Sequence, residues 1–149
     1  KAYNDKGWAT YGDIGHVDAN GYLYMSDRRV DLILSGGVNI YPAEIEGALM
    51  QHDAVDDAAV IGAPDAEFGE SVLAVIQLQP GVVGDEAMAE ALAAHCREHL
   101  AGMKVPRRFV FDHPLPRLES GKLLRRRLKD HFRTNAPGGF AVRRNKAAA

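Results

Sequence analysis

Short apolar runs separated by turn-forming residues make up most of the chain. The runs at 22–25, 32–34, 55–61, 71–78 and 109–111 consist mainly of strand-forming residues and end at glycine, proline or polar clusters, which predicts strands. Apolar residues dominate the runs at 55–61 and 71–78, so we expect both of these strands to be buried.

Helical spacing of apolar residues predicts three helices, over 42–51, from Asp85 to about Leu100, and from about Lys122 onward. Pro42 suits the first position of a helix, because its missing N–H has no partner there, and acidic residues follow it in the first turn. Asp85 is a candidate N-cap for the second helix. The residues expected on one face are Met88, Ala91, Leu92, His95 and Cys96 in the second helix, and Leu124, Leu128 and Phe132 in the third.

This order of elements predicts an α+β fold in which a small sheet is covered by helices. A glycine-containing turn at 18–21 predicts a β-hairpin before the sheet, and a polar elbow at 26–29 separates the two. Residues 134–149 contain glycine, proline and basic residues without apolar periodicity, which predicts a disordered tail.

Composition is that of an ordinary globular domain, since 46% of the 149 residues are hydrophobic and 26% are charged. No leader sequence is visible, and no apolar run approaches the about 18 residues that span a bilayer. The lone Cys96 excludes an internal disulfide and suits a reducing compartment. These features predict a cytoplasmic protein.

Charge is distributed unevenly along the chain, although the net charge is only −2. Residues 1–96 contain 4 Lys and Arg against 16 Asp and Glu, whereas residues 97–149 contain 14 against 4. The basic half could bind a polyanion such as nucleic acid, or the two halves could attract each other in the fold. The sequence leaves both interpretations open.

Three segments carry a resemblance to a known family. They are GDIGHVDANGYL at 12–23, DRRVDLILSGGVNIYPAEIE at 27–46 and PRLESGKLLR at 116–125. In this order they resemble motifs of the adenylate-forming acyl-CoA synthetases, and in particular the fatty-acid-CoA ligases. The resemblance implies that residues 1–26 end an N-terminal adenylation domain and that residues 27–133 form the mobile C-terminal domain.

The resemblance implies a reaction in two steps on one enzyme. A carboxylate and ATP give acyl-AMP and pyrophosphate, and the thiol of coenzyme A then displaces AMP. Mg²⁺ would accompany ATP, and no protein ligand for it is identified in this chain. The implied partners are the enzyme's own N-terminal domain and a small carboxylic acid, with no nucleic acid. The family's phosphate-binding loop and acyl pocket belong to the N-terminal domain, so this chain alone should not adenylate.

The resemblance also implies roles in adenylation for three residues. Lys122 would contact the carboxylate substrate and the α-phosphate, and an ammonium group suits a position between two anions. Asp13 and Arg28 would bind the ribose of ATP, and an ionised carboxylate accepts hydrogen bonds from vicinal hydroxyls.

In the second step the C-terminal domain would rotate about the elbow. Gly36 and Gly37 would then line the channel for the pantetheine arm, because glycine lets the backbone approach a narrow ligand. Val30 stands at the hinge position, where related enzymes usually carry Asp or Lys, and a β-branched residue is conformationally stiffer.

Two other functions remain open at this point. The domain could belong to a peptide-synthetase adenylation enzyme that serves a carrier protein, or the basic run at 125–129 could mark a nucleic-acid-binding module. His95, Cys96 and His99 have metal-ligand spacing, but no further ligand lies nearby in the sequence, so no metal site is predicted.

Overall fold

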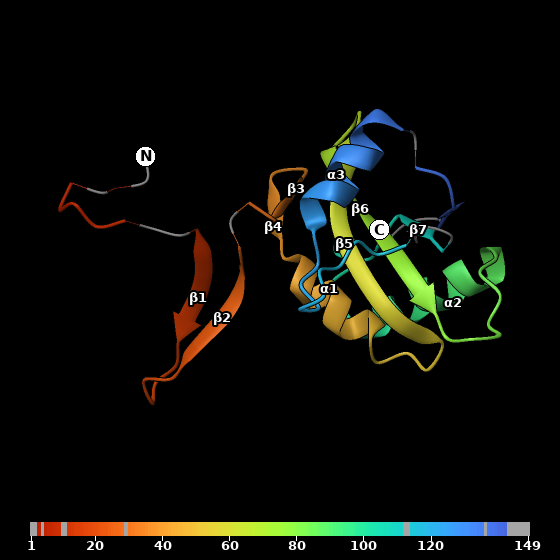
Figure 1. Ribbon diagram of the computed structural model, residues 1–149, viewed down its shortest axis with the longest axis horizontal. Helices are drawn as coiled ribbons and strands as arrows, with labels where there is room; N and C mark the ends of the chain where they lie inside the picture. The colour runs from red at the N-terminus through yellow and green to blue at the C-terminus, as the bar shows by residue number, and fades with distance from the viewer. Residues whose placement is uncertain are drawn as a thin grey trace, which may run out of the picture.

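A β-hairpin and a six-stranded sheet with three helices form the described part of the chain (Figure 1). The computed structural model describes residues 3, 5–9, 12–28, 30–111, 114–135 and 137–142, without the side chains of 26–28. No helix among these residues has the length and hydrophobicity that a membrane span requires.

The hairpin consists of β1 (Asp13–Val17) and β2 (Leu23–Arg28), which are antiparallel. Its turn is stabilised by the Asp18 carboxylate, whose Oδ1 accepts hydrogen bonds from the N–H groups of Asn20 (2.9 Å) and Tyr22 (3.0 Å). The hairpin projects away from the sheet and helices in Figure 1.

The longest pairing in the main sheet is antiparallel, between the outer strand β5 (Val55–Asp65) and β6 (Gly69–Leu78). β7 (Arg108–Val110) lies parallel to β6, and β8 (Phe140–Ala141) adds to the free edge of β7. Because β6 has strands on both sides, its backbone groups are largely satisfied within the sheet.

A second, shorter hairpin joins this sheet at one point. β3 (Ile33–Ser35) and β4 (Val38–Ile40) are antiparallel, and β3 meets β6 where Ser35 pairs with Gly69. This hairpin directly follows the segment around Val30, so its attachment to β6 connects that segment to the sheet.

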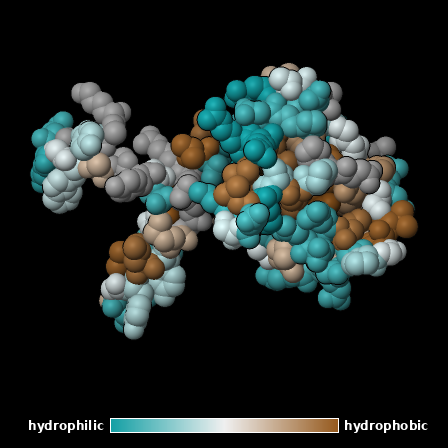
Figure 2. All heavy atoms as spheres, in the orientation of Figure 1, coloured by the Kyte–Doolittle hydropathy of each residue, from teal (hydrophilic) through white to brown (hydrophobic). Residues whose placement is uncertain are grey.

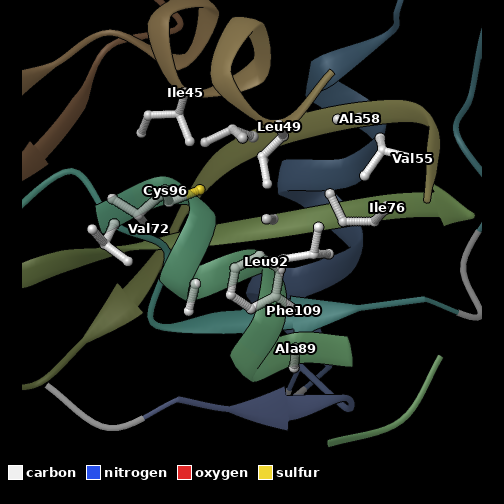
Figure 3. Packing of buried hydrophobic residues seen from close by; sticks show 14 of the residues in the cluster. Ile45, Leu49, Val55, Ala58, Val72, Ile76, Ala89, Leu92, Cys96 and Phe109 are labelled. Atoms are coloured by element: carbon white, nitrogen blue, oxygen red, sulfur yellow. The ribbon is translucent and has the colours of Figure 1, made fainter. Parts of the chain in front are cut away.

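Helices cover both faces of the sheet. α1 (Pro42–Leu49) and α2 (Glu86–His99) pack on one face, where their apolar side chains meet those of the strands in a large core (Figure 3). α3 (Arg125–Thr134) packs on the other face. Neighbouring residues along β5 and β6 therefore point their side chains into different cores. Both faces of these strands are buried, which explains their continuous apolar runs. Ala58, Val60, Val72, Ala74 and Ile76 face the first core, and Ala59, Ile61, Ala63, Leu73 and Val75 face the second.

The predicted α+β fold with a helix-covered sheet is confirmed, and the differences lie at element boundaries. β2 includes most of the expected polar elbow, β5 continues through Gly62 to Asp65, and α3 begins at Arg125 rather than near Lys122. Pairing with a neighbouring strand extends both strands beyond their local signals. In α2 the predicted N-cap is confirmed, but Ala91 is exposed, and the buried positions are Ala89, Leu92, Ala93 and Cys96.

The prediction of a disordered tail over 134–149 is wrong for residues 134 and 135, which end and cap α3, and for residues 137–142. β8 pairs with β7, and Phe140 and Val142 pack against the first core. Gly139 has a φ of +80°, and a Cβ there would lie 2.1 Å from the Phe109 carbonyl oxygen, so only glycine fits. A two-residue strand leaves almost no periodic signal in the sequence. Residues 136 and 143–149 of the predicted tail lie outside the described residues.

Ion pairs connect the acidic and basic halves of the chain. They join α1 to the segment before β7 and to the start of α3, β5 to the turn before α3, and the end of β5 to Arg107. This arrangement supports the interpretation that the two halves attract each other in the fold. The pairs are Glu44 with Lys104, Asp57 with Arg117, Asp65 with Arg107, and Glu46 with Arg125.

Candidate functional site

Lys122 lies at the end of a tight turn that precedes α3. Leu118 and Gly121 close the turn through a hydrogen bond from the Gly121 N–H to the Leu118 carbonyl (2.8 Å), and the Leu118 N–H donates to the Lys122 carbonyl (3.0 Å). Gly121 has a φ of +81°, which favours glycine at this position. The Lys122 side chain is exposed, so its ammonium group is accessible to a ligand from outside the domain.

Arg117 fixes this turn to β5. Its Nε and Nη2 atoms donate to the two carboxylate oxygens of Asp57 at 2.6 and 2.7 Å, and its Nη1 donates to the Gly121 carbonyl at 2.7 Å. The hydrogen bond with Asp57 raises the pKa of Arg117 further above its ordinary value. The guanidinium therefore stays charged and holds both ends of the turn.

Glu46 and Arg125 hold the start of α3 on the other side of the turn. Glu46 extends from α1, accepts a hydrogen bond from the Val60 N–H of β5 (2.8 Å), and forms an ion pair with Arg125. Each of the two side chains is only 17% exposed. The Lys122 turn is thus fixed by an arginine at each end, and both arginines are anchored through acidic residues to β5.

Gly36 and Gly37 form the turn between β3 and β4. Both have positive φ values, of 57° and 81°, which a two-residue hairpin turn of this kind requires. The Gly36 N–H donates to the Phe68 carbonyl (2.9 Å), and a Cβ on Gly36 would lie 3.0 Å from the Phe68 ring. Gly37 is exposed and has no atom within 4 Å of an added Cβ. Gly36 therefore contacts Phe68, whereas the backbone of Gly37 is accessible to a ligand.

Asp13 and Arg28 are neighbours across the β1–β2 hairpin. They are paired in the strand register, and Asp13 is exposed. The side chain of Arg28 lies outside the described part of the structure. Val30 follows two residues later and is 76% exposed, and its carbonyl accepts a hydrogen bond from the Lys129 ammonium of α3 (3.1 Å).

The Lys122 turn and the glycine turn lie at opposite ends of β5. Arg117 anchors the Lys122 turn at Asp57, whereas the glycine turn contacts Phe68, beside the end of the strand at Asp65. The eight residue steps from Asp57 to Asp65 correspond to roughly 25 Å of extended strand. The fold therefore brings Asp13 and Arg28 together and keeps the two turns apart.

The chain is similar in sequence to a known protein family and to individual enzymes. Residues 44–122 match the model of the AMP-binding enzyme C-terminal domain. The chain is 50% identical over 123 residues to the 2-succinylbenzoate–CoA ligase of Geobacillus kaustophilus, and this match covers 83% of the chain and 24% of the relative. It is 43% identical over 129 residues to the long-chain-fatty-acid–CoA ligase of Bacillus subtilis, covering 87% of the chain and 22% of the relative.

A solved structure shows the same fold. The o-succinylbenzoate CoA synthetase of Bacillus subtilis, in complex with its acyl-adenylate intermediate, superposes with a TM-score of 0.75 and 43% identity, covering 93% of this chain and 26% of that one. The chain belongs to the AMP-binding enzyme C-terminal domain family. It spans about a quarter of the length of the relatives that it matches.

Histidines of this AMP-binding enzyme C-terminal domain are already engaged in contacts within the fold. The His95 Nε2 atom lies 2.8 Å from the Ala48 carbonyl oxygen, and the His99 Nδ1 atom lies 2.8 Å from the His95 carbonyl oxygen. Cys96 is buried, and burial raises the pKa of its thiol to about 11. Among the described residues, no group of three or more His, Cys, Asp or Glu side chains could hold a metal ion.

Sequence reasoning missed the acidic residues that position the two turns. Asp57 and Glu46 anchor the arginines beside Lys122, and Glu70 contacts the strand that precedes the glycine turn. Glu46 lies at the end of the motif that closes with NIYPAEIE, and the local sequence there indicates only an acidic residue near the start of a helix. Asp57 and Glu70 had no local signal, because their partners lie 60 and 36 residues away.

Proposed function

We propose that this chain is the C-terminal part of an AMP-forming carboxylate–CoA ligase. Its family and its similarity to CoA ligases support this function. In this proposal residues 1–26 end the N-terminal adenylation domain and residues 27–133 form the mobile domain. The enzyme uses ATP with Mg²⁺ and coenzyme A as substrates, and this chain alone is inactive.

Exposed apolar side chains on the β1–β2 hairpin support an N-terminal domain as the partner. Val17, Leu23 and Met25 are 62, 65 and 59% exposed, and Figure 2 shows hydrophobic atoms gathered on this hairpin. Val17 pairs with Leu23, and Met25 lies two residues further along β2, so the three share one face. A cluster of exposed apolar side chains is typical of a surface that binds another protein part, which supports an N-terminal domain as its partner.

The separation of the two turns carries the proposal. One site cannot contact both ends of β5 at the same time, because they are roughly 25 Å apart along the strand. A rotation of the domain about the Val30 region would present the Lys122 turn for adenylation and the glycine turn for thioester formation. Asp13 and Arg28, which precede the hinge, would stay with the nucleotide in both steps.

Lys122 is the catalytic residue of the first step in this proposal. Its ammonium would lie between the substrate carboxylate and the α-phosphate, where it stabilises the negative charge as the mixed anhydride forms and pyrophosphate leaves. Loss of such a preorganised donor costs on the order of 3 kcal/mol of transition-state stabilisation. Arg117 and Arg125 position the turn through their ion pairs with Asp57 and Glu46.

The proposed acid is a fatty acid, and an aromatic carboxylic acid is the alternative. The fatty-acid assignment rests on the motif at residues 27–46 and on relatives that are long-chain-fatty-acid–CoA ligases. Relatives that are 2-succinylbenzoate–CoA ligases support the aromatic alternative. A panel of carboxylic acids, tested with the complete enzyme, distinguishes the two.

Substitution Lys122→Ala in the complete enzyme tests the proposal. Carboxylate-dependent exchange of pyrophosphate into ATP should fall by about 100-fold, which corresponds to about 3 kcal/mol. Thioester formation from pre-made acyl-adenylate and coenzyme A should survive. Arg126→Ala is the matched control, because Arg126 lies near Lys122 and its side chain is 94% exposed. Equal loss of both half-reactions in Lys122→Ala would contradict the assignment of Lys122. Transfer of the acyl group by the unchanged enzyme to a carrier protein instead of coenzyme A would indicate a peptide-synthetase enzyme.

A further inference from the structure

The strand before the glycine turn is held to the sheet by a side chain. β3 pairs with β6 only where Ser35 meets Gly69. One residue earlier, the Leu34 N–H donates to the Glu70 carboxylate, with 2.8 Å between N and Oε2. A charged acceptor makes a stronger hydrogen bond than a neutral carbonyl. Glu70 thus replaces the missing main-chain partner of β3.

Gly62 provides the space that this carboxylate occupies. A Cβ on Gly62 would lie 2.7 Å from the carboxyl carbon of Glu70 and 2.8 Å from each of its oxygens. Gly62 does not have a positive φ, so its backbone would accept an alanine. The glycine at this position is therefore required for the space that it leaves beside Glu70.

The contact between Glu70 and Leu34 adjoins the glycine turn. Leu34 is two residues before Gly36, whose N–H donates to the Phe68 carbonyl at 2.9 Å. The Phe68 ring in turn lies over the Arg107 guanidinium, with 4.1 Å between the ring centroid and Cζ. β3 and the turn are thus fixed at three successive points along one edge, at Leu34, Ser35 and Gly36.

We propose that Glu70, in the space left by Gly62, is a positioning residue that fixes the Gly36–Gly37 turn for thioester formation. This inference rests on the function proposed above. β3 is the first strand after Val30, so a domain rotation moves the turn accurately only if β3 is fixed to the sheet. Adenylation uses the Lys122 turn at the other end of β5, which Glu70 does not contact.

Kinetics of the two half-reactions in the complete enzyme test this role. Glu70→Ala should reduce thioester formation from pre-made acyl-adenylate by about tenfold, the effect of losing one hydrogen bond to a charged group. Pyrophosphate exchange should change by less than about twofold. Glu70→Gln should restore thioester formation, because its amide oxygen can accept from the Leu34 N–H.

Gly62→Ala provides an independent test from a different strand. Its Cβ should displace the carboxylate and reduce thioester formation to a similar extent. In the double variant with Glu70→Ala the second change should add nothing further, because the carboxylate is already absent. Gly47→Ala and Glu98→Ala are matched controls, since an added Cβ at Gly47 meets no atom within 4 Å and Glu98 is exposed on α2.

The possible outcomes separate this role from the proposed function. A complete enzyme that exchanges pyrophosphate but forms thioester normally in Glu70→Ala and Gly62→Ala overturns the role of Glu70 alone. Equal losses in both half-reactions, or additive losses in the double variant, also overturn it. An enzyme that exchanges no pyrophosphate with any acid contradicts the proposed function itself. Hydrogen exchange at the Leu34 amide then still shows whether Glu70→Ala removes the contact.

Discussion

Arg117 connects the Lys122 turn to the sheet through all three of its guanidinium nitrogens. Two of them bind the Asp57 carboxylate in a fork, and the third binds the Gly121 carbonyl directly before Lys122. Lysine would carry the same charge but could not reproduce the fork. At the scale of single residues, the position of the proposed catalytic ammonium therefore depends on the geometry of a neighbouring arginine.

Arg117→Lys should impair adenylation selectively. We expect pyrophosphate exchange to fall by about tenfold, because displacement of a catalytic group by a fraction of an ångström lowers the rate strongly. Thioester formation should change much less, since the glycine turn lies at the other end of β5. Half-reaction assays on the complete enzyme, with Arg126→Lys as control, measure this. Unchanged pyrophosphate exchange would show that the turn keeps its position without the fork.

Asp65 should make the stability of the domain depend on acid pH. Hydrogen bonds from the Phe68 and Glu67 N–H groups and the nearby Arg107 lower the pKa of its carboxyl in the fold, with Phe68 contributing most. The stabilisation is present above the unfolded pKa of about 4 and is lost as pH falls through the lower folded value. Asp65→Asn should therefore flatten the fall in unfolding free energy below about pH 5.

Urea unfolding of the domain at several pH values measures this effect. The exposed Asp53 provides a control, because Asp53→Asn removes a carboxylate that lies on the turn before β5. A variant Asp65→Asn whose stability falls with acid as steeply as that of the unchanged protein would contradict the role of Asp65.

At the scale of elements, the strands and helices that could be predicted are those long enough to show hydrophobic periodicity. β5, β6, α1 and α2 have enough residues to show their hydrophobic periodicity, and all four are found where expected. β4 (Val38–Ile40) and β8 (Phe140–Ala141) are too short to do so, and they exist because a neighbouring strand is available for pairing. The predicted site residues came from motif resemblance, whereas their acidic anchors arise from contacts between residues far apart in the sequence.

β8 provides a test at this scale, because two adjacent glycines differ in their surroundings. Gly139→Ala should destabilise the domain by more than about 1 kcal/mol, since its positive φ strains alanine and the added Cβ would lie against the Phe109 carbonyl. Gly138→Ala should be neutral, because nothing lies within 4 Å of an added Cβ. Urea unfolding midpoints measure both. Equal midpoints for the two variants would show that β8 does not contribute to the fold.

At the scale of the whole molecule, the two turns for which we propose different roles lie at opposite ends of β5, an outer strand of the six-stranded sheet. The segment at Val30 connects this sheet to the β1–β2 hairpin. Lys129 of α3 donates to the Val30 carbonyl, so the proposed hinge also has a hydrogen bond to the domain. A change at the hinge should therefore affect alternation between the two steps more than either turn by itself.

Val30→Pro should spare adenylation and damage thioester formation. Proline fixes φ and restricts the backbone, but it keeps the carbonyl that accepts from Lys129. Val30→Ala is the control, because alanine leaves the backbone free. Both half-reactions should be measured in the complete enzyme. An equal loss in the two half-reactions would reject Val30 as the hinge.

Pyrophosphate exchange and thioester formation, measured in the complete enzyme for Lys122→Ala and Glu70→Ala side by side, test whether the two turns act in different steps. Lys122→Ala should lose the first reaction and keep the second, whereas Glu70→Ala should keep the first and slow the second by about tenfold. Two variants that lose the same half-reaction would contradict a domain that uses its two ends in turn.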